Sequence, residues 1–299
     1  MIWIRPGLLA IGYAGAMMKI LVPLDGSDLS ESVLPSALAL AQRHRAEILL
    51  LRVVEHMGEL APGLAPELVP ELQQKALSRA LNYLENRSAR LTPALVTPIT
   101  AIGSPREQIA ALAEQHQCDL VLMASHGRDG AEHWLLGSVA EAVLRQAPCP
   151  VLLVRPPAAA ASVFRHILVP VDGSEASLAV LPALSAYLAP GGKVTLLQSG
   201  GISLYPNFAH KAQAVEAYLS QLEVDLRQIQ LPGLAPEVVV LDGNPVDDIL
   251  SWSQVNGCDL IAMSSHGRSG FRRFWLGSVS EKVARHALCD VLIFPHTAG

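Results

Sequence analysis

The sequence has few aromatic residues and no long apolar run. Phe, Trp and Tyr make up 5% of its 299 residues, although hydrophobic residues in total make up 51%. Such a composition favours a parallel sheet covered by helices over an aromatic-rich β-sandwich. No apolar segment approaches the roughly 20 residues that are needed to span a bilayer. We therefore expect a cytoplasmic protein that has no membrane partner.

An excess of positive charge is also missing. The net charge is −5 at pH 7. Residues 19–155 carry 12 basic and 15 acidic side chains, and residues 156–299 carry 9 and 12. Proteins that bind nucleic acid normally present a basic face. Because neither half has an excess of basic residues, we expect no nucleic-acid partner.

The sequence contains only four cysteines, and none has the spacing of a metal ligand. There is no CxxC motif and no Cys/His pattern, so we expect no metal site. Cys118 and Cys149 have counterparts in Cys258 and Cys289, 140 residues later. We expect these cysteines to be small residues that pack where strands begin. The alternative is a thiol pair formed by Cys118 and Cys149.

What the sequence does contain is an internal repeat. Residues 19–35 (KILVPLDGSDLSESVLP) recur at 166–182 (HILVPVDGSEASLAVLP) with 11 of 17 positions identical. Residues 125–145 (SHGRDGAEHWLLGSVAEAVLR) recur at 265–285 (SHGRSGFRRFWLGSVSEKVAR) with 12 of 21 identical. The length and the repeat together predict two domains, each with its own copy of any binding site.

The repeat also sets the domain boundaries. We expect an N-terminal extension at 1–16, a first domain at 17–155, a linker at 156–164 and a second domain at 165–299. Met17 and Met18 directly precede the first strand, which favours a misassigned start codon as the origin of the extension. A signal peptide is the alternative, and Pro6 with three glycines in the apolar stretch disfavours it.

Each half alternates short apolar runs with amphipathic segments, which is typical of parallel strands joined by helical crossovers. In the first half we expect strands at 20–24, 47–54, 94–102, 119–124 and 151–154, helices at 30–44, 71–90, 106–116 and 137–145, and a loop at 57–70. The order then repeats. The predicted fold class is α/β, with two tandem doubly wound domains that each contain a five-stranded parallel sheet.

Ligands of open α/β sheets bind beyond the carboxyl ends of the strands, where the strand order reverses. Two polar segments follow strands there in each half. The first is the turn at 25–27 (172–174), and the second is the Gly-rich loop at 125–138 (265–278). The second loop leads into a helix, whose unpaired N–H groups and partial positive charge suit a phosphate group. An aspartate at a strand end can accept hydrogen bonds from a ribose or an adenine amino group.

Together these segments resemble the universal stress protein family in its tandem two-domain form. The family signature is Gly, two residues, Gly, nine residues, then Gly-Ser or Gly-Thr. The halves read Ala124-x2-Gly127-x9-Gly137-Ser138 and Ser264-x2-Gly267-x9-Gly277-Ser278. The VPxDGS opening, the GSP or GNP turn and the CPVLLV-like last strand also match, so the resemblance covers about 18–155 and 165–296.

The resemblance implies an adenine nucleotide alpha hydrolase-like fold and, as in some family members, binding of ATP, alone or with Mg²⁺. In those members the aspartate after the first strand contacts the adenosine portion, and the loop with its following helix holds the phosphates. The matching positions in this sequence are Pro23, Asp25, Val53, Met123, Ala124, Gly127, Gly137, Ser138 and Val139 in the first half, and Pro170, Asp172, Met263, Ser264, Gly267, Gly277, Ser278 and Val279 in the second.

The sequence departs from the family pattern in ways that distinguish its halves. Ala124 and Ser264 replace the first glycine, so that a Cβ could crowd the nucleotide or require a negative φ. Residues 52–54 (RVV) become 198–200 (QSG), which removes an apolar wall. Residues 131–133 (AEH) become 271–273 (FRR), which adds cations for a triphosphate. Which half is occupied stays open.

We therefore expect a nucleotide-binding regulator or sensor of the stress response. The alternative is a stress adaptor that binds no nucleotide and acts through protein contacts. We expect no fast enzyme, and at most slow ATP hydrolysis or autophosphorylation. The resemblance also implies that the halves form an intramolecular pseudo-dimer through their last strands, 151–154 and 291–294, and that two chains can pair as a homodimer.

Overall fold

The computed structural model describes residues 17–60, 65–125, 136–155, 163–199, 236–265 and 276–295, together with Ala217 and Val224. The chain divides into two compact units, here called domain 1, which contains Gly12–Ser162, and domain 2, which contains Val163–Gly299. The expected N-terminal extension at 1–16 and most of the expected linker lie outside the described residues.

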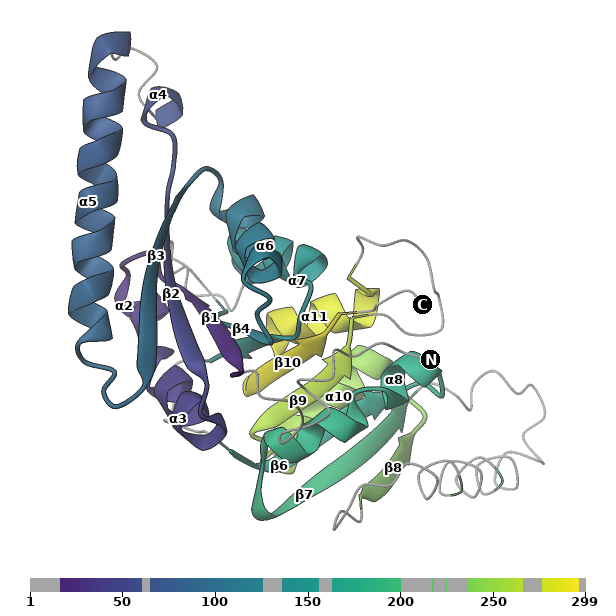
Figure 1. Ribbon diagram of the computed structural model, residues 1–299. Coiled ribbons are helices and arrows are strands. Elements are labelled where there is room, and N and C mark those ends of the chain that lie inside the picture. The colour runs from purple at the N-terminus through teal and green to yellow at the C-terminus, as the bar shows by residue number, and fades with distance from the viewer. Residues whose placement is uncertain are drawn as a thin grey trace. The chain divides into compact units, whose positions relative to one another are not determined.

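Domain 1 alternates strands and helices throughout its described residues. Its elements are β1 (Lys19–Pro23), α2 (Asp28–Glu31), α3 (Leu34–His44), β2 (Glu47–Val54), α4 (Met57–Leu60), the 3₁₀ turn η1 (Pro66–Leu68), α5 (Val69–Ser88), β3 (Leu95–Ile102), α6 (Pro105–Gln115), β4 (Leu120–Ala124), α7 (Ser138–Gln146) and β5 (Val151–Val154). Helices α3 and α5 lie on one side of the sheet, and α6 and α7 lie on the other (Figure 1).

The strands of domain 1 are parallel and run in the order β3-β2-β1-β4-β5. From β1 the chain builds outward through β2 to β3, then returns to the other side of β1 for β4 and β5. The strand order therefore reverses between β1 and β4. Both strands are covered on two faces, and Ile20, Leu21, Leu120 and Val121 have no exposed surface, which explains their continuous apolar sequence.

Domain 2 repeats the parallel strand order of domain 1, although a six-residue 3₁₀ helix stands where domain 1 has the eleven-residue helix α3. Its elements are β6 (Phe164–Val171), α8 (Glu175–Leu178), the 3₁₀ helix η2 (Leu181–Ala186), β7 (Leu188–Ser199), β8 (Glu237–Leu241), α10 (Pro245–Val255), β9 (Leu260–Ser264), α11 (Ser278–His286) and β10 (Asp290–Phe294). The parallel strand order is β8-β7-β6-β9-β10, so the reversal lies between β6 and β9. The predicted α/β fold with parallel sheets is confirmed.

Two elements of domain 1 differ from the prediction. The helix expected at 30–44 is two helices, α2 and α3, because Pro35 is the second residue of α3. A proline lacks an N–H and its ring clashes with the carbonyl four residues earlier, so α2 cannot continue through it. The loop expected at 57–70 contains α4 and η1. The amide of Met57 at the start of α4 donates to Gln73 Oε1 of α5 at 2.9 Å, a contact from 16 residues away.

Three further observations on the described residues concern membrane spans, metal clusters and cysteines. Within the described ranges, no helix is both long and apolar enough to cross a bilayer. The same ranges contain no group of three His, Cys, Asp or Glu side chains that could hold a metal ion. Cys118, Cys149 and Cys258 are buried, which agrees with packing near the strand starts.

Candidate functional site

The reversal between β1 and β4 brings the predicted site residues of domain 1 to one edge of its sheet. β1 pairs with β2 on one side and β4 on the other, with Leu21 opposite both Leu49 and Val121. Because these strands are parallel, their carboxyl ends meet at one edge, where Pro23 ends β1 and Ala124 ends β4. The corresponding edge of domain 2 carries Pro170, near the end of β6, and Ser264, which ends β9.

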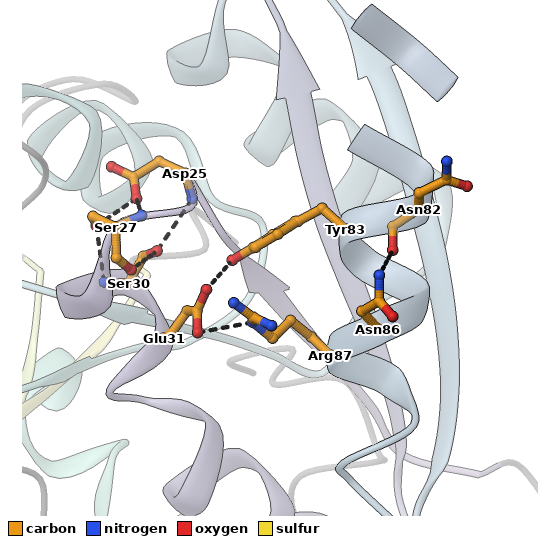
Figure 2. A network of polar contacts seen from close by, with 8 residues as sticks. All are labelled: Asp25, Ser27, Ser30, Glu31, Asn82, Tyr83, Asn86 and Arg87. Carbon is orange, nitrogen blue, oxygen red and sulfur yellow. Dashed lines mark hydrogen bonds and ion pairs between the residues drawn. The ribbon is translucent and has the colours of Figure 1, made fainter. Parts of the chain in front are cut away.

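Asp25 follows β1 and forms a tight turn. Its Oδ1 accepts hydrogen bonds from the amide of Ser27 at 2.9 Å and from the Ser27 hydroxyl at 2.6 Å (Figure 2). Ser27 Oγ then accepts from the amide of Ser30 at 3.1 Å, which caps α2. Gly26 has a φ of +78°, a conformation that glycine adopts without steric cost. The aspartate is therefore held by its own turn in a defined, half-buried position.

Domain 2 contains the same turn. Asp172 Oδ1 accepts from the Ser174 amide at 3.0 Å and from the Ser174 hydroxyl at 2.6 Å. Ser174 Oγ accepts from the amide of Ser177 at 3.2 Å, and Gly173 has a φ of +78°. The repeated sequence thus gives one local structure twice, and both copies present a carboxyl group at the point where the strand order reverses.

The helix that follows the Gly-rich loop begins close to the end of β4. The amide of Gly137 donates to the carbonyl of Ser125 at 3.0 Å, and Gly277 donates to Ser265 at 2.7 Å in domain 2. Gly137 and Gly277 are the N-caps of α7 and α11, and neither helix has a side-chain cap. Ser138 and Ser278 are exposed first residues of their helices, and neither caps its helix. Helix starts of this kind offer backbone donors to an anion.

The alanine and serine that replace the first signature glycine fit the backbone without strain. Ala124 and Ser264 are the last residues of β4 and β9 and are 6% and 9% exposed. Among the described non-glycine residues, only Arg45 and Gln117 have a positive φ. Neither position therefore requires the conformational freedom of glycine, and the neighbouring Met123 and Met263 are buried in the same strands.

The carboxyl ends of β2 and β7 differ, as the sequences of the halves predict. Strand pairing places Leu51 beside Pro23 and Leu197 beside Pro170, so Val53 and Ser199 occupy matching positions. Val53 offers an apolar surface, whereas the Ser199 hydroxyl donates to Asp248 Oδ2. Asp248 Oδ2 also accepts from the amide of Gly243 at 3.0 Å. A polar network therefore replaces the apolar wall in domain 2.

The structure does not describe every predicted residue. Gly127 and Gly267, and the loop positions 131–133 and 271–273, lie outside the described residues. The remaining predicted residues occur at three strand ends and one helix start in domain 1, where Val53 adds the end of β2, and at two strand ends and one helix start in domain 2. Val139 and Val279 are half-buried in the first turns of α7 and α11.

A polar cluster that was not predicted from the sequence lies beside the Asp25 turn. Glu31 of α2 accepts a hydrogen bond from the Tyr83 hydroxyl at 2.8 Å, and its other oxygen lies 2.8 Å from Arg87 Nε (Figure 2). The guanidinium carbons of Arg87 and Arg52 lie 5.0 and 5.3 Å from the centroid of the Tyr83 ring. We call Glu31, Arg52, Tyr83 and Arg87 the Tyr83 cluster. The sequence contained one signal of this cluster, a difference between the two halves: Leu178 and Gln198 stand in the second half where the first has Glu31 and Arg52.

The cluster is electrostatically well matched. Burial alone would raise the pKa of Glu31, but the contacts from Arg87 and Tyr83 outweigh it and lower that pKa. Burial and the hydrogen bond to the Glu31 carboxylate raise the pKa of Tyr83 to about 12. Glu31 and Arg87 are only 21% and 23% exposed, so water screens their attraction less than at an open surface.

Comparison with known proteins gives matches over both halves. The sequence model of the universal stress protein family matches residues 17–155 and 164–295. Universal stress protein MJ0531 of Methanocaldococcus jannaschii is 35% identical over 145 residues, which cover 46% of this chain and 82% of that protein. Universal stress protein MJ0577 of the same organism is 32% identical over 152 residues, which cover 46% of this chain and 94% of that protein.

A solved structure matches the fold of the whole chain. The crystal structure of a universal stress protein from Archaeoglobus fulgidus DSM 4304 has a TM-score of 0.70 at 21% sequence identity. The match covers 93% of this chain and 98% of that chain. At this identity the likeness shows the fold alone.

Proposed function

The chain belongs to the universal stress protein family, with one copy of the family domain in each half, and we propose that it binds ATP or a related adenine nucleotide at one or both copies. The observation that carries the proposal is the pairing of two features at the reversal of strand order. One is the aspartate turn after the first strand. The other is a helix start that has no side-chain cap and lies beside the neighbouring strand. Both features occur in both domains.

The residues divide into two groups by the part of the nucleotide that they suit. Asp25 and Asp172 are acceptors for the hydroxyl or amino groups of adenosine, and Val53 adds an apolar surface in domain 1. The backbone amides at the starts of α7 and α11 suit the phosphates, as do the hydroxyls of Ser138 and Ser278. Ala124 and Ser264 do not distort the backbone of the site, because their strand conformation does not depend on glycine. Mg²⁺ would accompany the phosphates of bound ATP.

We propose binding rather than catalysis as the function, with a role as a regulator or sensor of stress. Any turnover is at most slow hydrolysis or autophosphorylation of ATP. The family resemblance also supports an intramolecular pseudo-dimer through the last strands of the two domains, and a homodimer of such chains. These strands are β5 and β10, each of which is the last strand in the order given above for its domain. Pairing protects the exposed backbone groups of an edge strand.

Nucleotide binding can be tested by the thermal stability of the full chain in millimolar MgATP. A ligand that binds only the folded state stabilises it by about 2.7 kcal/mol at 100 times its dissociation constant, so we expect a clear rise in Tm. The matched control is the double variant Asp25→Asn, Asp172→Asn. Asparagine keeps the oxygen that accepts from Ser27 or Ser174, so the turns persist while each carboxylate is lost.

Three further results distinguish nucleotide binding from the two alternatives, an adaptor and an enzyme. Loss of the Tm rise in the double variant, and in Gly137→Val, Gly277→Val, supports nucleotide binding at the proposed sites. A wild-type protein that neither carries nucleotide after purification nor gains stability from MgATP supports the adaptor that acts through protein contacts. Release of ADP over many turnovers, well above that of the double valine variant, would instead indicate an ATP-dependent enzyme.

A further inference from the structure

The Tyr83 cluster is joined to the aspartate turn of domain 1 through a single turn of helix. Helix α2 has four residues, from Asp28 to Glu31. Ser27 caps its start and also binds Asp25, while Glu31 at its end binds Tyr83 and Arg87 of α5 (Figure 2). A helix this short is not stable alone, because nucleation fixes several residues for one hydrogen bond. Its stability therefore depends on the contacts at its two ends.

Arg52 of β2 also contacts the turn, at Gly26. A Cβ built on Gly26 would lie 2.5 Å from Arg52 Nη1, so the guanidinium group packs directly against the backbone of the turn. The same guanidinium lies against the Tyr83 ring, within the range of a cation–π attraction. Tyr83 thus links Arg52 and Glu31, and these two residues hold opposite ends of the segment that contains Asp25.

Domain 2 cannot form this cluster. Leu178 ends α8 where Glu31 ends α2, and Gln198 of β7 stands where Arg52 stands in β2. The carboxylate and the guanidinium are both absent at these positions. Yet the Asp172 turn has the same geometry as the Asp25 turn, with bonds to its serine that differ by no more than 0.1 Å. The cluster therefore does not determine the shape of the turn.

We infer that the Tyr83 cluster is a clamp that keeps the Asp25 turn closed, and that domain 1 is consequently the tighter of the two nucleotide sites. A group that is already ordered loses less conformational entropy when it binds. The clamp residues are positioning residues, since they act on the ligand through Asp25. The polar network of Ser199 in domain 2 favours the same ranking, because it removes the apolar wall that Val53 supplies. The ranking rests on the proposed nucleotide binding, whereas the clamp itself does not.

The clamp can be tested without nucleotide by amide hydrogen exchange of the full chain. Peptides that cover 24–32 and 171–179 report the two turns in one molecule, so the second is an internal reference. We expect slower exchange at 24–32. Glu31→Leu and Arg52→Gln introduce the residues of domain 2. Glu31→Leu should raise exchange at 24–32 about tenfold, the effect of losing one charged hydrogen bond. Arg52→Gln should raise it about threefold, the effect of losing the cation–π contact with Tyr83. Exchange at 171–179 should not change.

Two milder variants guard against unfolding as the cause. Tyr83→Phe keeps the ring between the guanidinium groups and removes only the hydroxyl, and Glu31→Gln keeps a hydrogen-bond acceptor and removes the charge. Both should increase exchange at 24–32 less than Glu31→Leu does. Equal exchange at the two turns in the wild-type protein, or no local increase in any variant that remains folded, would overturn the clamp.

Calorimetric titration with ATP then tests the ranking. Glu31→Leu should weaken the tighter site about fivefold and leave the weaker site unchanged. If exchange increases at 24–32 but the tighter affinity does not change, the turn does not control binding and the ranking is wrong. If the wild-type protein shows the clamp by exchange but binds no ATP, the clamp is supported and the proposed nucleotide binding fails.

Discussion

Gly26 is the residue on which the geometry of the Asp25 turn depends most directly. Its φ of +78° lies in the left-handed region, which costs an L-residue about 1–2 kcal/mol. A Cβ there would also meet the guanidinium group of Arg52. The position therefore combines a backbone requirement with a packing requirement, and the two can be separated by experiment.

We predict that Gly26→Ala destabilises domain 1 by about 1–2 kcal/mol from the backbone cost alone, with a further loss as Arg52 is displaced. The matched control is Gly191→Ala. Gly191 has a φ of +71° but no heavy atom within 4 Å of a built Cβ, so this variant should show the backbone cost only. Denaturant unfolding measures both changes. Equal losses in the two variants would show that Arg52 does not pack firmly on the turn.

His166 is a buried histidine of domain 2. The residue is 5% exposed, and its Nε2 lies 3.0 Å from Thr195 Oγ1 and its Nδ1 3.2 Å from the carbonyl oxygen of Asn256. Burial, with a smaller effect of Lys193, lowers the pKa of His166 below its ordinary value of 6.5. The folded state therefore favours the neutral ring more strongly than the unfolded state does.

We predict that acid reduces the stability of domain 2 through His166. Because the pKa of His166 is lower in the folded state, unfolding at acidic pH takes up a proton. The contribution of the neutral ring to the free energy of unfolding is therefore fully present above pH 6.5 and is lost as the pH falls below that value. His166→Gln removes this proton uptake. The stability difference between the wild type and the variant should therefore be largest near pH 8 and shrink toward pH 5.5. A difference that stays constant over this range would contradict the prediction.

The sequence identified Asp25 and Asp172 because an internal repeat preserves both with their turns. It also showed the change from Val53 to Ser199, but not that the serine would bind Asp248, which lies 49 residues away. The contact of Glu31 with Tyr83 spans 52 residues and joins two helices. Local patterns do not specify such contacts, because they arise only when separate crossovers pack on one face of the sheet.

At the scale of elements, matching helices in the two domains begin with different caps. Asn244 precedes α10 and accepts from the amides of Val246 at 3.0 Å and Asp247 at 3.5 Å. Ser104 precedes α6 at the equivalent position and makes no side-chain cap hydrogen bond. We predict that Asn244→Ala costs about 1 kcal/mol. Ser104→Ala should cost much less, and thermal unfolding of both variants checks the difference.

The elements also show which parts of the fold are encoded locally. The strand at 47–54 was predicted with the bounds of β2, because a run of aliphatic residues between polar residues defines a buried strand. The helix at 30–44 was wrong in one respect, since the apolar periodicity continues through Pro35 although the backbone cannot. Helix α4 could not be predicted from its own four residues, because Gln73 of α5 stabilises its first amide.

For the whole molecule, the duplicated sequence explains the duplicated fold and the two aspartate turns. Strand order could not be obtained from the repeat alone, since alternating strands and helices are compatible with more than one order. The order in the structure places the first and fourth strands of each domain side by side, and so gives the two polar segments a common edge. The differences between the halves then become differences between two similar sites on one chain.

The number of nucleotides that one chain retains through purification depends on the affinity of each of its two sites. If the clamp makes domain 1 the tighter site, purified protein should carry about one adenine nucleotide per chain, because a weakly held nucleotide is lost during washing. Asp25→Asn should remove the retained nucleotide, and Asp172→Asn should leave it in place. Chromatography of the small molecules released on denaturation measures all three values. Two nucleotides per chain would mean that both sites hold nucleotide tightly, which would contradict the ranking. Loss in Asp172→Asn alone would mean that domain 2 is the tighter site and that the phosphate end rather than the adenosine end sets the ranking.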